Sequence, residues 1–239
     1  MAEAAWKPGL RAVVWMLVAL LVASLGVAMA SEVSGALERE REFRAAPDCA
    51  SVPVKVSACL WEQDFTVRKA ALHRGKRGKS PEAELVLPSG KPWQVTFRNT
   101  DPVVSEMEPD DKVAGLIWYG DVVEVRDADG RRQQTSDGPV NWPEDRLGGA
   151  IGCISFGAVA FIGSLWGLLG RRSRRQVVAA ATVRWHGLGI GVAAIVTLWV
   201  QAAAGWPLWS IPVGWGVLTL LLLGSAVGFV VAALRGAIK

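Results

Sequence analysis

Four long apolar blocks without a charged side chain constrain how this chain of 239 residues can fold. A run of about 18 or more apolar residues is long enough to cross the roughly 30 Å hydrocarbon core of a bilayer as a helix. In that environment every backbone N–H and C=O group must form a hydrogen bond within the protein, and a single helix meets this requirement by itself. The blocks therefore predict four transmembrane helices, and they cover residues 12–30, 147–170, 187–204 and 211–234.

Pro143, Glu144 and Asp145 precede the second block and are typical of the first turn of a helix. Proline suits the first helical position, and acidic side chains are favourable beside a helix N-terminus. The second transmembrane helix is therefore predicted to begin at Pro143 and to reach residue 170.

The charged residues are divided unevenly along the chain. Residues 31–146 contain 17 Lys and Arg and 21 Asp and Glu, a balance of −4, whereas the rest of the chain contains 9 and 1, a balance of +8. Lys and Arg beside membrane spans are retained on the cytoplasmic side. Both termini are therefore predicted to be cytoplasmic and residues 31–146 extracytoplasmic. Because the basic charge lies beside the spans, it does not indicate a nucleic-acid-binding surface.

The densest basic stretch is "RRSRRQ" at 171–176, in the predicted loop between the second and third spans. Such a loop is an ordinary topology determinant. Its arginines can also contact anionic lipid headgroups, at about 1 kcal/mol each. These arginines are Arg171, Arg172, Arg174 and Arg175.

The first span has some features of a cleaved signal peptide. Lys7 and Arg11 precede it, and it ends in the small-residue sequence Ala28-Met29-Ala30. Its apolar run is nevertheless longer than the usual signal core of about 7–15 residues, so we favour an uncut anchor. The charged segment that follows predicts a helical continuation, because charges recur at helical spacing in the pairs Glu40 with Arg44 and Glu38 with Arg41.

Residues 47–142 predict a small β-rich domain. Apolar and polar residues alternate over 65–72, 83–87, 93–98, 112–119 and 121–127, and turn-forming residues at 88–92 and 127–130 separate short runs. Five or six short strands in about 100 residues indicate a small antiparallel β-barrel or sandwich. The aromatic residues expected to anchor its core are Trp61, Trp93, Phe97 and Trp118.

The predicted fold class is therefore a four-helix α-helical membrane protein with an inserted extracytoplasmic antiparallel β-barrel or sandwich. Its parts are a cytoplasmic N-terminus (1–11), transmembrane helix 1 (12–30), a charged juxtamembrane helix (31–46), the β-rich domain (47–142), transmembrane helix 2 (143–170), a basic cytoplasmic loop (171–186), transmembrane helix 3 (187–204), an outer loop (205–210), transmembrane helix 4 (211–234) and a cytoplasmic C-terminus (235–239).

Cys49 and Cys59 are the two cysteines of the exported part. An oxidising exterior favours a disulfide between them, which would stabilise the domain by about 3 kcal/mol on the chain-entropy model. A metal-binding or a redox-active pair remains an alternative, although the spacing is not C-x-x-C and no histidine is near in sequence. Cys153 lies within the second span and is expected to be a packing residue.

The sequence indicates no catalytic or metal-binding constellation. His73 lies in a polar stretch and is expected to be a solvated loop residue, and His186 is expected at the membrane interface. The acidic run at 105–111 lacks the ligand spacing of a calcium-binding loop and predicts a solvated loop. We therefore expect no enzyme activity, no cofactor and no metal. Within the spans, Gln201 is the most polar side chain, which argues against an ion-coupled carrier.

Glycines at four-residue spacing lie on the last three spans. Such pairs let helix backbones approach closely, so they predict packing within the chain, with a dimer face as the alternative. The pairs are Gly148 with Gly152, Gly163 with Gly167, Gly187 with Gly191, and Gly224 with Gly228.

The chain resembles uncharacterised small multi-span membrane proteins of high-GC Gram-positive bacteria. The resemblance rests on the Ala/Val/Gly/Arg-rich composition, the segment "AGLIWYGDVVEV" at 114–125 with its downstream "T...GP", and the layout of one span followed by three. It implies a plasma-membrane location and carries no activity.

The leading hypothesis is a non-enzymatic membrane protein whose outer β-domain binds or senses an envelope component or a protein partner. The alternatives are a subunit of a transporter or channel, and a surface hydrolase. The expected partners are membrane lipids and a membrane protein or a second copy of the chain, with no nucleic acid.

Overall fold

The computed structural model describes residues 3–53, 55–73, 79–170 and 172–237, with side chains from Gly9 onward. The chain forms two compact units. The helical unit comprises residues 1–36 and 141–239, and the sheet unit comprises residues 37–140.

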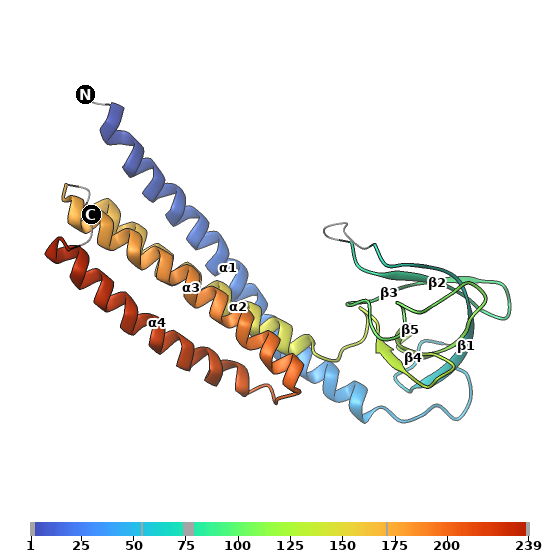
Figure 1. Ribbon diagram of the computed structural model, residues 1–239. Helices are drawn as coiled ribbons and strands as arrows, with labels where there is room; N and C mark the ends of the chain where they lie inside the picture. Colours follow the sequence, from blue (N-terminus) through green and yellow to red (C-terminus); the bar gives the residue numbers. More distant parts are fainter. Residues whose placement is uncertain (1–2, 54, 74–78, 171, 238–239) are drawn as a thin grey trace. The chain divides into compact units, whose positions relative to one another are not determined.

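Four helices are long and apolar enough to cross a membrane (Figure 1). They are α1 (Glu3–Ala45), α2 (Trp142–Leu169), α3 (Arg174–Ala204) and α4 (Ser210–Arg235). Helix α1 continues without a break through the charged segment 31–45, where Arg44 donates a 2.9 Å hydrogen bond to Glu40. The structure thus forms one of the two predicted pairs, Glu40 with Arg44.

Helix α3 begins earlier than the third predicted span. It starts at Arg174, so that most of the segment 171–186 is helical and not a loop. The reason lies in the sequence 177–183, which contains no glycine or proline, and in the burial of Ala179 and Ala180 against α2. A Cβ added at Gly163 of α2 would lie only 3.1 Å from the carbonyl oxygen of Ala180.

Close glycine packing joins α2 to α3. A Cβ added at Gly152 would lie 3.3 Å from the Cβ of Ala194, so the two backbones approach at this level as small residues allow. Six of the eight predicted packing glycines face the partner helix in this seam, namely Gly148, Gly152, Gly163, Gly167, Gly187 and Gly191. The other two, Gly224 and Gly228 on α4, have no described atom within 4 Å of an added Cβ.

Helix α1 packs on a second face of α2. A Cβ added at Gly157 would lie 2.7 Å from the carbonyl oxygen of Ala19, and one added at Gly26 would lie 2.9 Å from the Cβ of Cys153. At the end of the unit where α2 begins, Arg146 forms a 2.9 Å ion pair with Glu32. The small residues and this ion pair together hold α1 against α2.

The sheet unit contains one antiparallel sheet of six strands in the order β3-β2-β1-β4-β5-β6. Each strand predicted from alternation is present, with bounds that differ by a few residues. The strands are β1 (Trp61–Ala71), β2 (Glu82–Val86), β3 (Pro92–Thr96), β4 (Lys112–Trp118), β5 (Asp121–Arg126) and β6 (Arg132–Gln134).

The sheet is open, which corrects the predicted closed barrel or two-sheet sandwich. Over the described residues its two edge strands meet at a single bridge, between Phe97 and Thr135, beside a 2.7 Å hydrogen bond from the Ser136 amide to the Thr96 carbonyl. Strand β6 has only three residues, and β3 begins at Pro92, which has no N–H to donate. The edge strands β3 and β6 are therefore too short to form a full ladder of hydrogen bonds that would close the sheet.

The core of the sheet unit lies on the concave side of this curved sheet. Phe97 and Trp118 are buried as expected, whereas Trp61 and Trp93 are only partly buried and pack against the core. Phe65 on β1 is fully buried and contacts Trp93 edge-on, with ring centroids 5.8 Å apart. A Cβ added at Gly115 of β4 would lie 2.7 Å from the Phe65 ring, so glycine leaves the room that this ring occupies.

Segment 46–60 covers the end of β4 and carries the disulfide. Cys49 and Cys59 are bonded, as predicted. The amide of Leu60 donates a 2.8 Å hydrogen bond to the Pro47 carbonyl, and the Trp118 indole donates a 2.9 Å bond to the Ala58 carbonyl. The disulfide therefore closes a segment that also shields a buried tryptophan.

Candidate functional site

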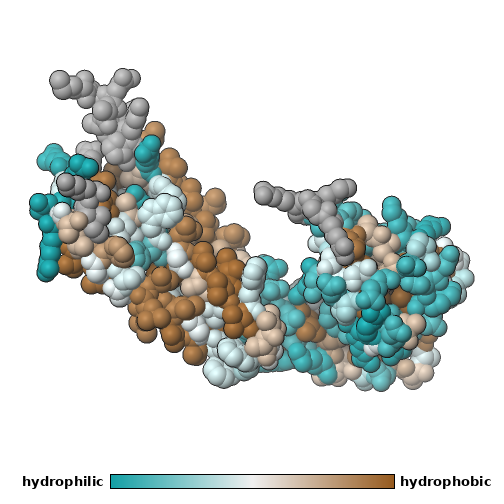
Figure 2. Space-filling model, viewed as in Figure 1, coloured by the Kyte–Doolittle hydropathy of each residue, from teal (hydrophilic) through white to brown (hydrophobic). Residues whose placement is uncertain are grey.

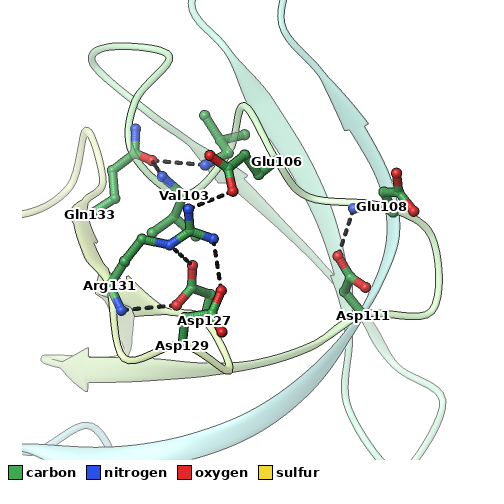
Figure 3. A network of polar contacts seen from close by, with 9 residues as sticks. Val103, Glu106, Glu108, Asp111, Asp127, Asp129, Arg131 and Gln133 are labelled. Carbon is green, nitrogen blue, oxygen red and sulfur yellow. Dashed lines mark hydrogen bonds and ion pairs between the residues drawn. The ribbon is translucent and has the colours of Figure 1, made fainter.

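An acidic hollow lies on the sheet unit where two loops meet (Figure 3). Residues 103–113, which lead into β4, form one wall, and the β5–β6 turn at 127–131 forms the other. The cavity volume is about 310 Å³. Its charged lining consists of the carboxylates Glu106, Glu108, Asp111, Asp127 and Asp129 and the cations Lys112 and Arg131, a formal balance of −3.

Gln133 on β6 holds the first wall in place. Its side-chain oxygen accepts hydrogen bonds of 2.7 Å and 2.8 Å from the amides of Val103 and Val104. Its side-chain nitrogen donates a 2.8 Å bond to the carbonyl oxygen of Asn99. Gln133 is only 3% exposed, and Val103 and Val104 belong to the hydrophobic core. The acidic loop is thus fixed at its base although its carboxylates reach solvent.

Arg131 joins the two walls. Its guanidinium donates a 2.7 Å hydrogen bond to Asp127 and pairs with Glu106 on the opposite loop and with Asp129 on its own turn. The hydrogen bond to Glu106 is the main cause that raises the pKa of Arg131 above its usual value. A charged fork with several carboxylate partners holds a loop more specifically than a single surface ion pair.

The remaining carboxylates point away from this network. Figure 3 shows Glu108 and Asp111 on the outer part of the loop, where Asp111 accepts a 2.7 Å hydrogen bond from the Glu108 amide. Lys112 is directed to Thr66, to which its ammonium group donates a 2.6 Å bond. The hollow therefore keeps an excess of negative charge near its rim.

The described residues include no group of three or more His, Cys, Asp or Glu side chains arranged to hold a metal ion. The acidic hollow has carboxylates and cations and no histidine or cysteine in its lining. The anionic groups in its lining are carboxylates.

The two histidines make specific contacts. His73 is not the solvated loop residue that the sequence predicted, because its side chain is 15% exposed and its Nε2 lies 3.0 Å from a Glu82 oxygen. The neighbouring charged residues 74–78 lie outside the described part of the chain. His186 links α3 to α4, with its Nδ1 donating to the Thr182 carbonyl and its Nε2 3.0 Å from the Ser225 hydroxyl.

The structure places the other predicted residues apart from the hollow. Arg171 lies outside the described residues, whereas Arg172, Arg174 and Arg175 are exposed where α2 gives way to α3. Gln201 is buried at the end of α3 and donates a 2.7 Å hydrogen bond to the Trp206 carbonyl in the loop to α4. Gln201 thus has a structural role in that turn.

Sequence reasoning missed the hollow as a site. It treated the acidic run 105–111 alone and named residues 127–130 only as a turn. The signal that could have joined them is Arg131 beside the turn sequence "DADG", because a guanidinium has enough donors to pair with its own turn and with the acidic run. Comparisons of the chain with protein-family models, curated proteins and solved structures find no match.

Proposed function

We propose that the chain is a non-enzymatic integral protein of the plasma membrane, whose sheet unit lies outside the cell and binds a cationic envelope component or a cationic patch of a protein partner. The observation that carries this proposal is the acidic hollow, a cavity with fixed walls and excess negative charge on a unit with its own core and disulfide. A preorganised, charged concave surface favours recognition of the opposite charge.

The charge pattern supports the orientation. Basic residues flank the start of α1, the α2–α3 link and the end of α4, and residues 31–146 carry the acidic excess. Lys and Arg beside spans favour the cytoplasmic side, and a disulfide favours an oxidising compartment. Both termini are therefore proposed to be cytoplasmic.

The orientation can be tested by labelling thiols on intact cells. In a Cys153→Ala variant, reduction followed by a membrane-impermeant maleimide is expected to label Cys49 and Cys59 without cell lysis. The matched control is Cys49→Ala, Cys59→Ala, Cys153→Ala with Ser173→Cys, whose single thiol lies in the α2–α3 link. We expect this control to be labelled only after permeabilisation. The reverse pattern would invert the orientation and refute the proposed location of the hollow.

The ligand class can be tested with a fluorescent tetralysine peptide, titrated against the full-length protein in detergent. Glu108→Gln combined with Asp129→Asn removes two rim carboxylates, both exposed, and leaves the main Arg131 contacts in place. We expect the Kd to rise about tenfold, since an exposed ion pair contributes up to about 1 kcal/mol. The measurement is fluorescence anisotropy at fixed ionic strength.

The matched control is Glu38→Gln combined with Glu42→Gln, which makes the same charge change at exposed positions on α1. This control is expected to leave the Kd within about twofold, because screened charges far from the hollow contribute little. Equal losses in both double variants would show that the peptide binds net charge and not the hollow. No binding by the wild-type protein would remove the proposed ligand class.

A further inference from the structure

Arg184 of α3 lies along two glycines of α2. A Cβ added at Gly163 would lie 2.9 Å from the Arg184 Cγ, and a Cβ added at Gly167 would lie 3.5 Å from its Nη1. The side chain is half-buried between the two helices. We call Gly163, Gly167 and Arg184 the glycine groove. Its glycines leave the space that the stem occupies, and its guanidinium points toward the end of α2 at Leu169.

The guanidinium of Arg184 has no hydrogen-bond or ion-pair partner among the residues that the structure describes. Beyond Asp145 the sequence has no Asp or Glu. Glu32 and Asp145 belong to the other end of the unit, where α2 begins, and the side chain of Glu3 lies outside the described ones. A half-buried cation without an anion is costly, so this group needs a negative partner from outside the described chain.

The depth of Arg184 matches a membrane interface. Residues 185–204 of α3 would form a helix about 30 Å long at 1.5 Å per residue, which equals the thickness of the hydrocarbon core. If Ala204 is at the outer surface, Arg184 lies at the inner boundary. Its Nη1 lies near Gly167, within one turn of the end of α2, as expected for a side chain that extends toward headgroups.

Further cations gather at the same end of the helical unit. Arg172 and Arg174 are exposed at the α2–α3 link, and the Arg175 guanidinium lies 3.3 Å from a Cβ added at Gly236, just beyond Arg235 of α4. Figure 2 shows hydrophilic residues at this end and hydrophobic residues along the helices. A ligand of this region therefore meets positive charge at one end and exposed apolar helix along the rest.

We propose that the glycine groove binds the phosphate group of an anionic phospholipid, with Arg184 as its principal donor. The planar guanidinium can donate two parallel hydrogen bonds to one phosphate, and basic pockets between transmembrane helices are suited to such headgroups. The exposed apolar surface of α2 and α3 favours a lipid over a soluble anion, because acyl chains can cover it. This inference rests on the proposed membrane location of the helices and is independent of the ligand of the acidic hollow.

The test titrates the full-length protein in detergent with fluorescent phosphatidylglycerol. Arg184→Gln is expected to weaken binding about tenfold, since it removes a charged donor, and Arg184→Lys is expected to fall between it and the wild type because the ammonium lacks the planar fork. The matched control is Arg68→Gln, which removes the same charge at an exposed position of the sheet unit. It is expected to change the Kd by no more than about twofold.

Two further measurements, both on the wild-type protein, identify the source of the phosphate group. Wild-type protein is expected to bind fluorescent phosphatidylcholine at least about tenfold more weakly than phosphatidylglycerol, and millimolar inorganic phosphate is expected not to compete. Equal losses in Arg68→Gln and Arg184→Gln, equal affinity for the two lipids, or full competition by inorganic phosphate would each overturn the assignment. If such a result came together with the expected thiol labelling of intact cells, the proposed orientation would still hold. Only the assignment of lipid binding to the glycine groove would then be rejected.

Discussion

Replacing Phe65 with alanine is expected to lower the free energy of unfolding of the sheet unit by about 3–5 kcal/mol. Phe65 is 1% exposed and lies on β1, which pairs with both β2 and β4 near the middle of the sheet. Its ring contacts Trp93 edge-on and fills the space over Gly115. Because the residue opposite is glycine, it has no side chain of its own that could move into the cavity.

Hydrogen exchange of peptides from β1 and β4, in the full-length protein, measures this loss. Global opening is expected to become roughly 150- to 5,000-fold more frequent, as the change in free energy requires. The control is Val52→Ala, which shortens an apolar side chain that is 62% exposed, with an expected effect below about 0.5 kcal/mol. Exchange at wild-type rates in Phe65→Ala would contradict the assignment of Phe65 to the centre of the core.

Five of the strands were predictable because apolar and polar residues alternate over a short run of sequence. In β4, Val113, Gly115 and Ile117 are buried and alternate with more exposed residues. Period-2 alternation does not show which strand is central. Phe65 was therefore not recognised as a core anchor, while Trp61 and Trp93, chosen for their size, pack only at the margin.

Closure of the sheet could not be predicted from local patterns. Whether the edges of a curved sheet join depends on the lengths and register of strands far apart in sequence, here β3 and β6. Only Phe97 and Thr135 pair across that gap in the described chain. The number of strands alone does not distinguish an open curved sheet from a small barrel.

The helical unit shows the same division between local and non-local information. Four helices follow from hydropathy alone, but the glycine pairs carry no indication of their partner. The pairs on α2 and α3 face each other, whereas an added Cβ at Gly224 or Gly228 would meet open space. The early start of α3 depends on the packing of Ala179 and Ala180, which sequence alone does not reveal.

The acidic hollow depends on contacts between segments about 30 residues apart. Gln133 binds the amides of Val103 and Val104, and Arg131 pairs with Glu106. Neither a glutamine in a short strand nor an acidic loop is by itself a signal of a functional site. Their combination becomes a site only when β6 brings Gln133 beneath the loop.

Replacing both Cys49 and Cys59 with alanine is expected to destabilise the closed form of segment 46–60 by about 3 kcal/mol, the chain-entropy contribution of a loop of this length. The hydrogen bonds that then open are those that this segment makes, from the Leu60 amide to Pro47 and from the Tyr119 amide to Ser57. Hydrogen exchange at these amides is expected to become about 10²-fold faster.

A cysteine outside the pair provides the control for this prediction. Cys153→Ala changes a partly buried residue of α2 and is expected to leave exchange in segment 46–60 unchanged. Reduction of the wild-type protein should reproduce the exchange rates of the double variant and have no effect on that variant itself. If the double variant exchanged at the wild-type rate, the backbone bonds of Leu60 and the indole bond of Trp118 would suffice to hold the segment closed. The disulfide would then contribute no measurable stability to the closed form of this segment of the sheet unit.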